Sequence, residues 1–231
     1  LRRHAFTPLW LGYIGVVNAW TYRRAGVCLL THRPGTLAGL LVASVAFWWL
    51  FEYLNQFVHN WHYAGLTART DLGYFLAASP PFATVLAAVL ATRDLLTTFP
   101  RLAAGLGRAW RPPALPRPLW SGLALALGVT GLVAVGWRGE WFFPLLWVAP
   151  LLVVWGIQGL AGEATLADDA GRGDWRPIWL AALAALVCGV LWELWNAGSL
   201  ARWQYAVPYV GAWRLFEMPV LGYAGYLPFG L

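Results

Sequence analysis

Long apolar stretches constrain the fold of this chain more than any other feature of its sequence. The 231 residues are 60% hydrophobic and only 11% charged, whereas a soluble domain carries about a quarter charged residues. A helix needs roughly 20 apolar residues to cross a bilayer. The sequence therefore predicts an all-α polytopic membrane protein with seven transmembrane helices, over about residues 6–22, 36–58, 73–92, 118–137, 141–162, 177–197 and 209–231.

One motif occurs twice inside these stretches. The first copy reads FEYLN over residues 51–55 and WHY over 61–63, and the second reads WELWN over 192–196 and WQY over 203–205. Both copies thus contain an aromatic residue, a glutamate and, three residues later, an asparagine, followed by Trp-x-Tyr. Because a carboxylate is costly to bury in an apolar helix, an ionisable residue inside the membrane is a functional-site hypothesis by default.

The repeat extends beyond this motif. Phe-x-Pro-Leu opens the first expected span at residues 6–9 and the fifth at 142–145. The two motif copies are separated by four expected crossings, so the halves would run parallel, related by an axis along the membrane normal. We therefore expect a 3+1+3 arrangement. Residues 1–97 form the first three-span repeat, 98–140 a basic, proline-rich linker with a connector span, and 141–231 the second three-span repeat.

The arginines indicate an orientation in the membrane. All sixteen basic residues are arginine; ten fall in connections after the first, third and fifth expected spans, and six fall on the other side. Since cytoplasmic loops are enriched in basic residues, we expect the N-terminus outside and the C-terminus in the cytoplasm. The lack of lysine suggests a GC-rich bacterial genome, hence a bacterial inner membrane. The arginines in these loops account for the net charge of +6 through membrane topology, so no nucleic-acid partner is expected.

No cofactor is expected from the sequence. The two cysteines, Cys28 and Cys188, offer neither a disulfide framework nor a metal pair. The chain contains no phosphate-binding loop, dinucleotide fingerprint, Gly-x-Ser-x-Gly or His-Glu-x-x-His motif.

The glutamates and asparagines of the motif are the candidate catalytic residues. Residues three apart on a helix share a face, so each glutamate would lie beside its asparagine, and two packed halves would bring both pairs to one cavity. A buried carboxyl group that keeps its proton can act as a general acid. We expect Glu52 and Glu193 to be proton donor and base in an order that stays open, Asn55 and Asn196 to orient them, and a third acid, Glu217, to tune them.

A purely structural role is the alternative for the same residues. Each glutamate could be neutral, or hydrogen-bonded to its asparagine and to a tryptophan indole, and so link helices within the membrane.

Aromatic residues surround the motif and are the candidate substrate-binding residues. Aromatic faces attract cations, and a proton donor walled by such faces suits alkene protonation and carbocation cyclisation. The predicted lining consists of Trp48, Trp49, Phe51, Trp61, Tyr63, Trp192, Trp195, Trp203 and Tyr205. For the two Trp-x-Tyr segments the alternative is an aromatic belt at the membrane interface.

The arrangement resembles the integral-membrane lycopene cyclases, which have two three-span repeats and a connector span. Phe51-Glu52 with residues 61–63, and Trp192-Glu193 with residues 203–205, look like that family's acidic and aromatic element. The family's Pro-x-Glu-Glu signature has no counterpart here. The resemblance implies a carotenoid cyclase or isomerase that needs no redox cofactor.

These features together favour one function and leave two others open. The first is a membrane-embedded cyclase or isomerase that acts on a lipid-soluble isoprenoid or carotenoid by glutamate acid–base catalysis. The second is a non-catalytic pigment- or lipid-binding subunit of a larger membrane complex. The third is a small proton-coupled transporter, since parallel repeats with intramembrane acids also serve proton coupling. The expected partners are a lipid-soluble small molecule, membrane lipids and, for a subunit, a larger complex.

Overall fold

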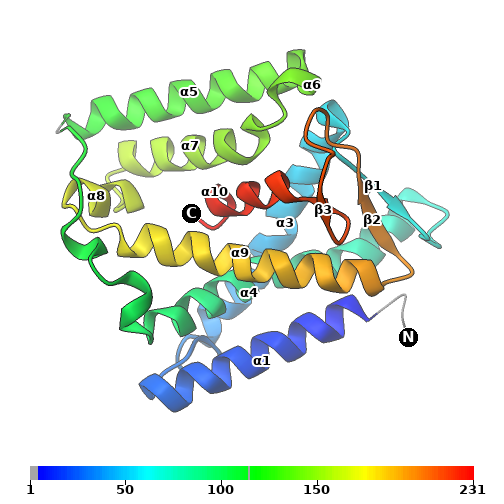
Figure 1. Ribbon diagram of the computed structural model, residues 1–231, viewed down its shortest axis with the longest axis horizontal. Coiled ribbons are helices and arrows are strands. Elements are labelled where there is room, and N and C mark those ends of the chain that lie inside the picture. The colour runs from blue at the N-terminus through cyan, green and yellow to red at the C-terminus, as the bar shows by residue number, and fades with distance from the viewer. Residues whose placement is uncertain (1–4, 114) are drawn as a thin grey trace.

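The protein is mostly helical (Figure 1) in a computed structural model that describes residues 5–113 and 115–231. Arg2 and Arg3, two of the six arginines assigned to the outer side, lie outside the described residues, as does Ala114 of the predicted linker. The longer helices are α1 (Phe6–Ala25), α3 (Pro34–Val58), α4 (Asp71–Thr97), α5 (Arg117–Trp137), α7 (Leu145–Leu160) and α9 (Arg176–Gly198).

Short elements connect these helices and follow the last of them. The short helices are α2 (Leu29–His32), α6 (Gly139–Phe142), α8 (Leu166–Gly171) and α10 (Tyr226–Phe229), with 3-10 turns η1 (Pro100–Ala103), η2 (Leu106–Arg108) and η3 (Val220–Gly225). The strands are β1 (Trp61–Ala64), β2 (Arg202–Tyr205), β3 (Arg214–Leu215) and β4 (Met218–Pro219).

Four helices within the described part of the chain are long and apolar enough to cross a membrane: α3, α4, α5 and α9. Helix α7 is apolar but shorter, and α1 lies where the first span was expected without being one of the four. A chain with four such helices has the character of a membrane protein. Helix α4 packs against α1, α3 and α9 and so forms the centre of the bundle.

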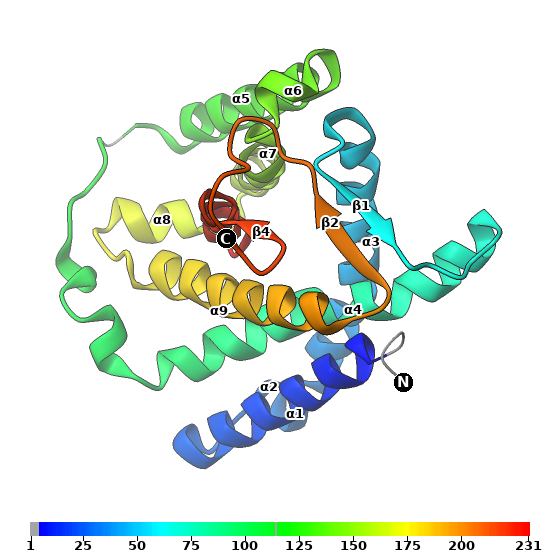
Figure 2. The ribbon, with the colours of Figure 1, turned by 45° about the vertical axis from the view of Figure 1, so that its right-hand side comes forward.

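The last expected span, over 209–231, is wrong as a single helix. The chain there forms the β3–β4 hairpin and becomes helical only from Val220, through η3 and α10. Pro219 fits this change because proline cannot donate a backbone hydrogen bond inside a helix. The α10 segment then lies between α7 and α9 (Figures 1 and 2). Irregular backbone at membrane depth is tolerated when it is buried in protein in this way.

Two strands that the all-α prediction did not include join the two copies of the motif. Strand β1 follows α3, strand β2 follows α9, and they pair antiparallel. Trp61 is opposite Tyr205, His62 is opposite Gln204, and Tyr63 is opposite Trp203. Side chains alternate between the two faces of a strand, so the aromatic residues of both segments share one face, and His62 and Gln204 share the other.

Glycines let helices α5 and α7 approach closely. A Cβ atom on Gly128 would lie 2.7 Å from the backbone nitrogen of Val153 and 2.8 Å from the carbonyl oxygen of Ala149. In the other direction, a Cβ atom on Gly156 would lie 2.7 Å from the backbone nitrogen of Leu125. Backbone atoms cannot move aside as a flexible side chain can, so these glycines set the spacing of the two helices.

We therefore expect Gly128→Ala to destabilise the protein by about 1–3 kcal/mol through overpacking. Gly122→Ala in the same helix is the matched control, because its Cβ atom would meet nothing within 4 Å and alanine favours a helix over glycine. The midpoint of thermal unfolding in detergent measures both. A midpoint for Gly128→Ala equal to or above that of Gly122→Ala would contradict the close α5–α7 approach.

Candidate functional site

The two motif asparagines hold the Trp-x-Tyr strands in place. The Asn55 side chain accepts a hydrogen bond from the Trp61 backbone nitrogen at 3.3 Å and donates one to the Trp61 carbonyl oxygen at 2.8 Å. Asn196 makes the same two bonds with Trp203, both at 2.9 Å. The expected role of the asparagines was to orient the glutamates. Their side-chain hydrogen bonds instead fix the strand that follows each helix.

Glu52 is surrounded by aromatic donors. Its Oε1 atom accepts hydrogen bonds from the Trp48 and Trp61 indoles, each at 3.1 Å, and from the Tyr63 hydroxyl at 2.6 Å. The side chain is partly buried. One oxygen with three donors is well suited to carry negative charge.

Glu193 occupies the corresponding place in the second copy but differs in its partners. The residue is fully buried, and its Oε1 atom accepts hydrogen bonds from the Tyr205 hydroxyl at 2.7 Å and the Tyr226 hydroxyl at 2.9 Å. The Trp203 indole donates to the Tyr205 hydroxyl at 2.8 Å rather than to the glutamate. The Oε2 atom has no hydrogen-bond partner among the described residues. The two glutamates are therefore not equivalent.

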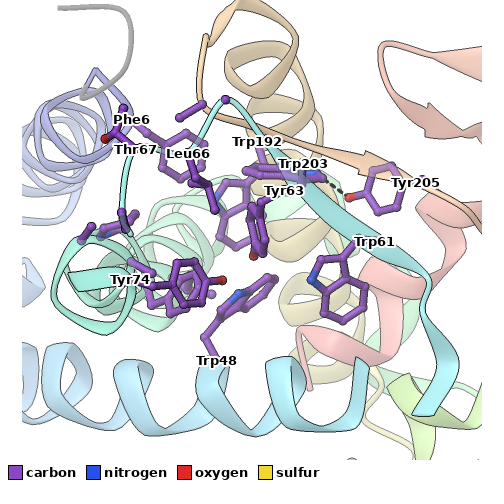
Figure 3. A pocket seen from close by; sticks show the side chains of 18 of the residues that line it. Phe6, Trp48, Trp61, Tyr63, Leu66, Thr67, Tyr74, Trp192, Trp203 and Tyr205 are labelled. Atoms are coloured by element: carbon purple, nitrogen blue, oxygen red, sulfur yellow. Dashed lines mark hydrogen bonds between the residues drawn. The ribbon is translucent and has the colours of Figure 1, made fainter. Parts of the chain in front are cut away.

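Aromatic side chains enclose a cavity of about 180 Å³ in front of these two networks. Figure 3 shows Trp48 from α3, Tyr74 from α4, and Trp61 and Tyr63 from β1 around it. The aromatic lining consists of Phe6, Trp48, Trp61, Tyr63, Tyr74, Phe82, Trp147, Trp192, Trp203, Tyr205, Tyr226 and Phe229. Small residues complete the wall along the first half of α4 and in the loop that precedes it.

Six of the nine predicted lining residues reach this cavity: Trp48, Trp61, Tyr63, Trp192, Trp203 and Tyr205. The other three pack elsewhere. Trp49 donates a hydrogen bond to Ser79 at 3.1 Å, Phe51 stacks on Trp147 with ring centroids 5.2 Å apart, and Trp195 lies against Trp10 at 4.7 Å. Neighbouring residues on a helix point in different directions, so closeness in sequence to a glutamate does not place an aromatic ring in the cavity.

The predicted acids lie behind the cavity wall or away from it. Glu52 and Glu193 contact the tyrosine hydroxyls that line the cavity but are not themselves part of its lining. Glu217 lies in the turn between β3 and β4, with Oε1 3.6 Å from an Arg202 guanidinium nitrogen. Both glutamate–asparagine pairs were expected to meet at one cavity; in the structure each glutamate lies behind its own tyrosine.

Some lining residues were not predicted from the sequence. Tyr226 and Phe229 come from the C-terminal segment, which was expected to be one transmembrane helix, and Trp147 lies on α7. For Phe6 a signal existed, since it opens the Phe-x-Pro-Leu repeat. Nothing in the spacing of Tyr226 indicates that it meets Glu193.

The strand tyrosines stay protonated. Burial, and after it the neighbouring Glu52, raise the pKa of Tyr63 well above its ordinary value. Burial raises the pKa of Tyr205 in the same way, followed by the effects of Tyr226 and Glu193. Both phenols are therefore hydrogen-bond donors at neutral pH, each to a glutamate oxygen.

Comparison with known proteins gives no relative for this chain: no protein-family model, curated protein or solved structure matches it. Across residues 5–113 and 115–231, no three His, Cys, Asp or Glu side chains are grouped as metal ligands would require.

We expect Asn196→Ala to destabilise the protein by about 1–3 kcal/mol, because it leaves the backbone N–H and C=O groups of the half-buried Trp203 without their side-chain partner. It should also change the tryptophan fluorescence of the cavity, since Trp203 lines it. Asn18→Ala is the control, because Asn18 is equally buried and bonded but lies away from the cavity. If both variants changed stability and fluorescence alike, Asn196 would have no particular role at the site.

Proposed function

We propose that this protein is a membrane-embedded cyclase or isomerase that acts on a lipid-soluble isoprenoid or carotenoid. The observation that carries the proposal is the aromatic cavity with a carboxylate behind each of two lining tyrosines. An apolar, aromatic wall suits a hydrocarbon ligand, and aromatic faces favour a cation that forms within it. A volume of about 180 Å³ is below the roughly 300–1,000 Å³ of sites that enclose a whole drug-sized ligand. The cavity would hold one part of a long chain.

The proposed chemistry is acid–base catalysis. A proton adds to one alkene carbon and leaves a carbocation on the other. An internal double bond then attacks that cation to form the ring bond, and loss of a proton restores an alkene. The proton gained and the proton lost balance, so no oxidant or reductant is needed. Each tyrosine hydroxyl can exchange protons between its glutamate and the cavity, because a hydroxyl both donates and accepts. For uptake, the hydroxyl gives its proton to the glutamate that it already contacts and takes one from the substrate cation. For delivery, it gives its proton to the alkene, and the protonated glutamate turns its O–H toward the hydroxyl to replace that proton.

The unequal partners of the two glutamates suggest the order of these steps. We assign Glu193 with Tyr205 to proton delivery, since a charged oxygen without a donor is costly to bury, and Glu193 Oε2 is such an atom among the described residues. We assign Glu52 with Tyr63 to proton uptake, because three donors on Oε1 suit a carboxylate.

Infrared spectroscopy tests this order without a substrate. Wild-type protein should show the carbonyl stretch of a protonated carboxylic acid at neutral pH. Glu193→Gln should remove that band and Glu52→Gln should keep it. Loss of the band in Glu52→Gln, with retention in Glu193→Gln, would reverse the assignment.

A second candidate function is a non-catalytic pigment- or lipid-binding subunit of a larger membrane complex. The observation that favours it is that Glu52 Oε1 holds three aromatic side chains and does not itself line the cavity. In that case the carboxylates would only shape the binding wall.

Mass spectrometry of the organic extract from purified protein distinguishes the two functions. The samples are cells that express wild-type protein, Glu52→Gln/Glu193→Gln, or Glu140→Gln, whose glutamate is exposed and is not part of the cavity lining. A bound isoprenoid whose ring content or double-bond positions change only in the double variant supports a cyclase or isomerase. The same bound compound in all three samples would contradict catalysis and favour the binding subunit.

The arrangement in the membrane is also a proposal. The resemblance to the membrane lycopene cyclases and the repeated helix–strand element support two parallel repeats. The arginine-containing connections that follow α1, α4 and α7 are proposed to face the cytoplasm of a bacterial cell, with the aromatic cavity toward the outer side.

A further inference from the structure

A second cavity, of about 1040 Å³, lies at the opposite end of the helices, where α4 ends and α9 begins. Its charged lining comes from α4, η2, α8 and the start of α9: Arg93, Asp94, Arg108, Asp169, Asp174 and Arg176. None of these residues lines the aromatic cavity. The proposed chemistry leaves this second cavity without a role.

Each carboxylate of this cavity already has an arginine partner. Asp174 accepts hydrogen bonds from Arg176 at 2.6 and 2.8 Å. Asp94 is ion-paired with Arg33, and Asp169 with Arg172. Three arginines and three aspartates line the cavity. Arg33 and Arg172 lie outside the lining but neutralise Asp94 and Asp169, so the whole cluster of five guanidinium groups and three carboxylates keeps two positive charges.

The two remaining charges belong to Arg93 and Arg108. Arg93 is 3.6 Å from the same Asp94 that Arg33 binds. Arg108 has no ion pair among the described residues. Both line the cavity; Arg93 is half-buried there, whereas Arg108 is exposed. The partial burial of Arg93 reduces the screening of its charge, and Arg108 adds a second charge at the mouth of the cavity.

The surroundings place this cavity at the level of a membrane surface. Apolar side chains such as Phe99 and Leu180 form part of its wall, and the Arg24 guanidinium lies 3.8 Å from the Phe99 ring centroid. At the start of α9, the exposed Trp179 donates its indole hydrogen bond to the Leu102 carbonyl oxygen at 2.8 Å. Tryptophan at the end of a membrane-spanning helix is typical of the interface.

We propose that this cavity binds the phosphate of an anionic phospholipid head group, with Arg93 and Arg108 as its ligands. Guanidinium groups bind phosphate through paired, charge-assisted hydrogen bonds, and basic pockets between transmembrane helices are suited to such head groups. The apolar wall favours a lipid over a soluble phosphate, because it can contact the glycerol and the first part of the acyl chains. This site does not depend on the proposed catalytic function.

Native mass spectrometry of the protein released from nanodiscs tests the proposal. The nanodiscs contain equal parts of phosphatidylcholine and cardiolipin. We expect the wild-type protein to retain cardiolipin preferentially and Arg93→Gln/Arg108→Gln to bind it about thirtyfold more weakly. Arg69→Gln/Arg138→Gln, which removes two exposed charges elsewhere, should bind as the wild type does.

A variant that is expected to bind the lipid more tightly controls for a loss of binding that comes only from misfolding. Asp94→Asn removes the carboxylate that Arg33 and Arg93 share, so we expect it to retain cardiolipin about fivefold more tightly. Equal binding by wild type and Arg93→Gln/Arg108→Gln, or an equal loss in the control variant, would overturn the proposal. Displacement of the lipid by glycerol phosphate at matched concentration would also overturn it and would indicate a soluble phosphoryl ligand.

Discussion

The pairing of β1 with β2 is the interaction on which the rest of the site depends. It joins the ends of α3 and α9, which are far apart in sequence, through four residues on each side. Because strand side chains alternate, the pairing turns Trp61 and Tyr63 to the same face as Trp203 and Tyr205. That face becomes a wall of the aromatic cavity. The helices add Trp48 from α3 and Trp192 from α9 to the same cavity, and the strand pair supplies the wall that carries the two tyrosines.

Buried polar groups explain why the β1–β2 pair is held in one arrangement. A carboxylate that is removed from water is costly unless donors surround it. Glu52 meets that requirement with two indoles and a phenol on Oε1. Glu193 meets it on Oε1 alone, with two phenols, which favours its protonated form. The donors come largely from the strands, so each carboxylate also fixes the aromatic residue that contacts a ligand. Stability and the shape of the cavity therefore rest on the same hydrogen bonds.

Much of the helical framework could be predicted from composition alone. Helices α3, α4, α5 and α9 coincide with apolar stretches that were long enough to identify without a structure. The Glu-x-x-Asn spacing and the Trp-x-Tyr segments also pointed to the site, because both copies recur in register. The spacing of two between Trp and Tyr is the period of a strand, and it was the one local signal for β1 and β2.

Other parts could not be read from the sequence for physical reasons. The segment after Trp203 is apolar, yet it forms a hairpin and a short helix because prolines and glycines interrupt it and α7 and α9 enclose it. An apolar composition predicts that a segment is buried, but it does not predict the backbone conformation of that segment. Tyr226 reaches Glu193 only through this tertiary arrangement. Similarly, Trp49 and Trp195 lie beside motif residues in sequence but face other neighbours.

Disulfide trapping across the strand pair tests the central claim most directly. His62 and Gln204 are opposite each other on the face away from the cavity, and opposed residues in an antiparallel pair are close enough for a disulfide. Both native cysteines are buried. Under mild oxidation His62→Cys/Gln204→Cys should form the disulfide rapidly, and the misregistered His62→Cys/Arg202→Cys should form it far more slowly. No disulfide in the first variant, or equal rates in both, would contradict the paired site.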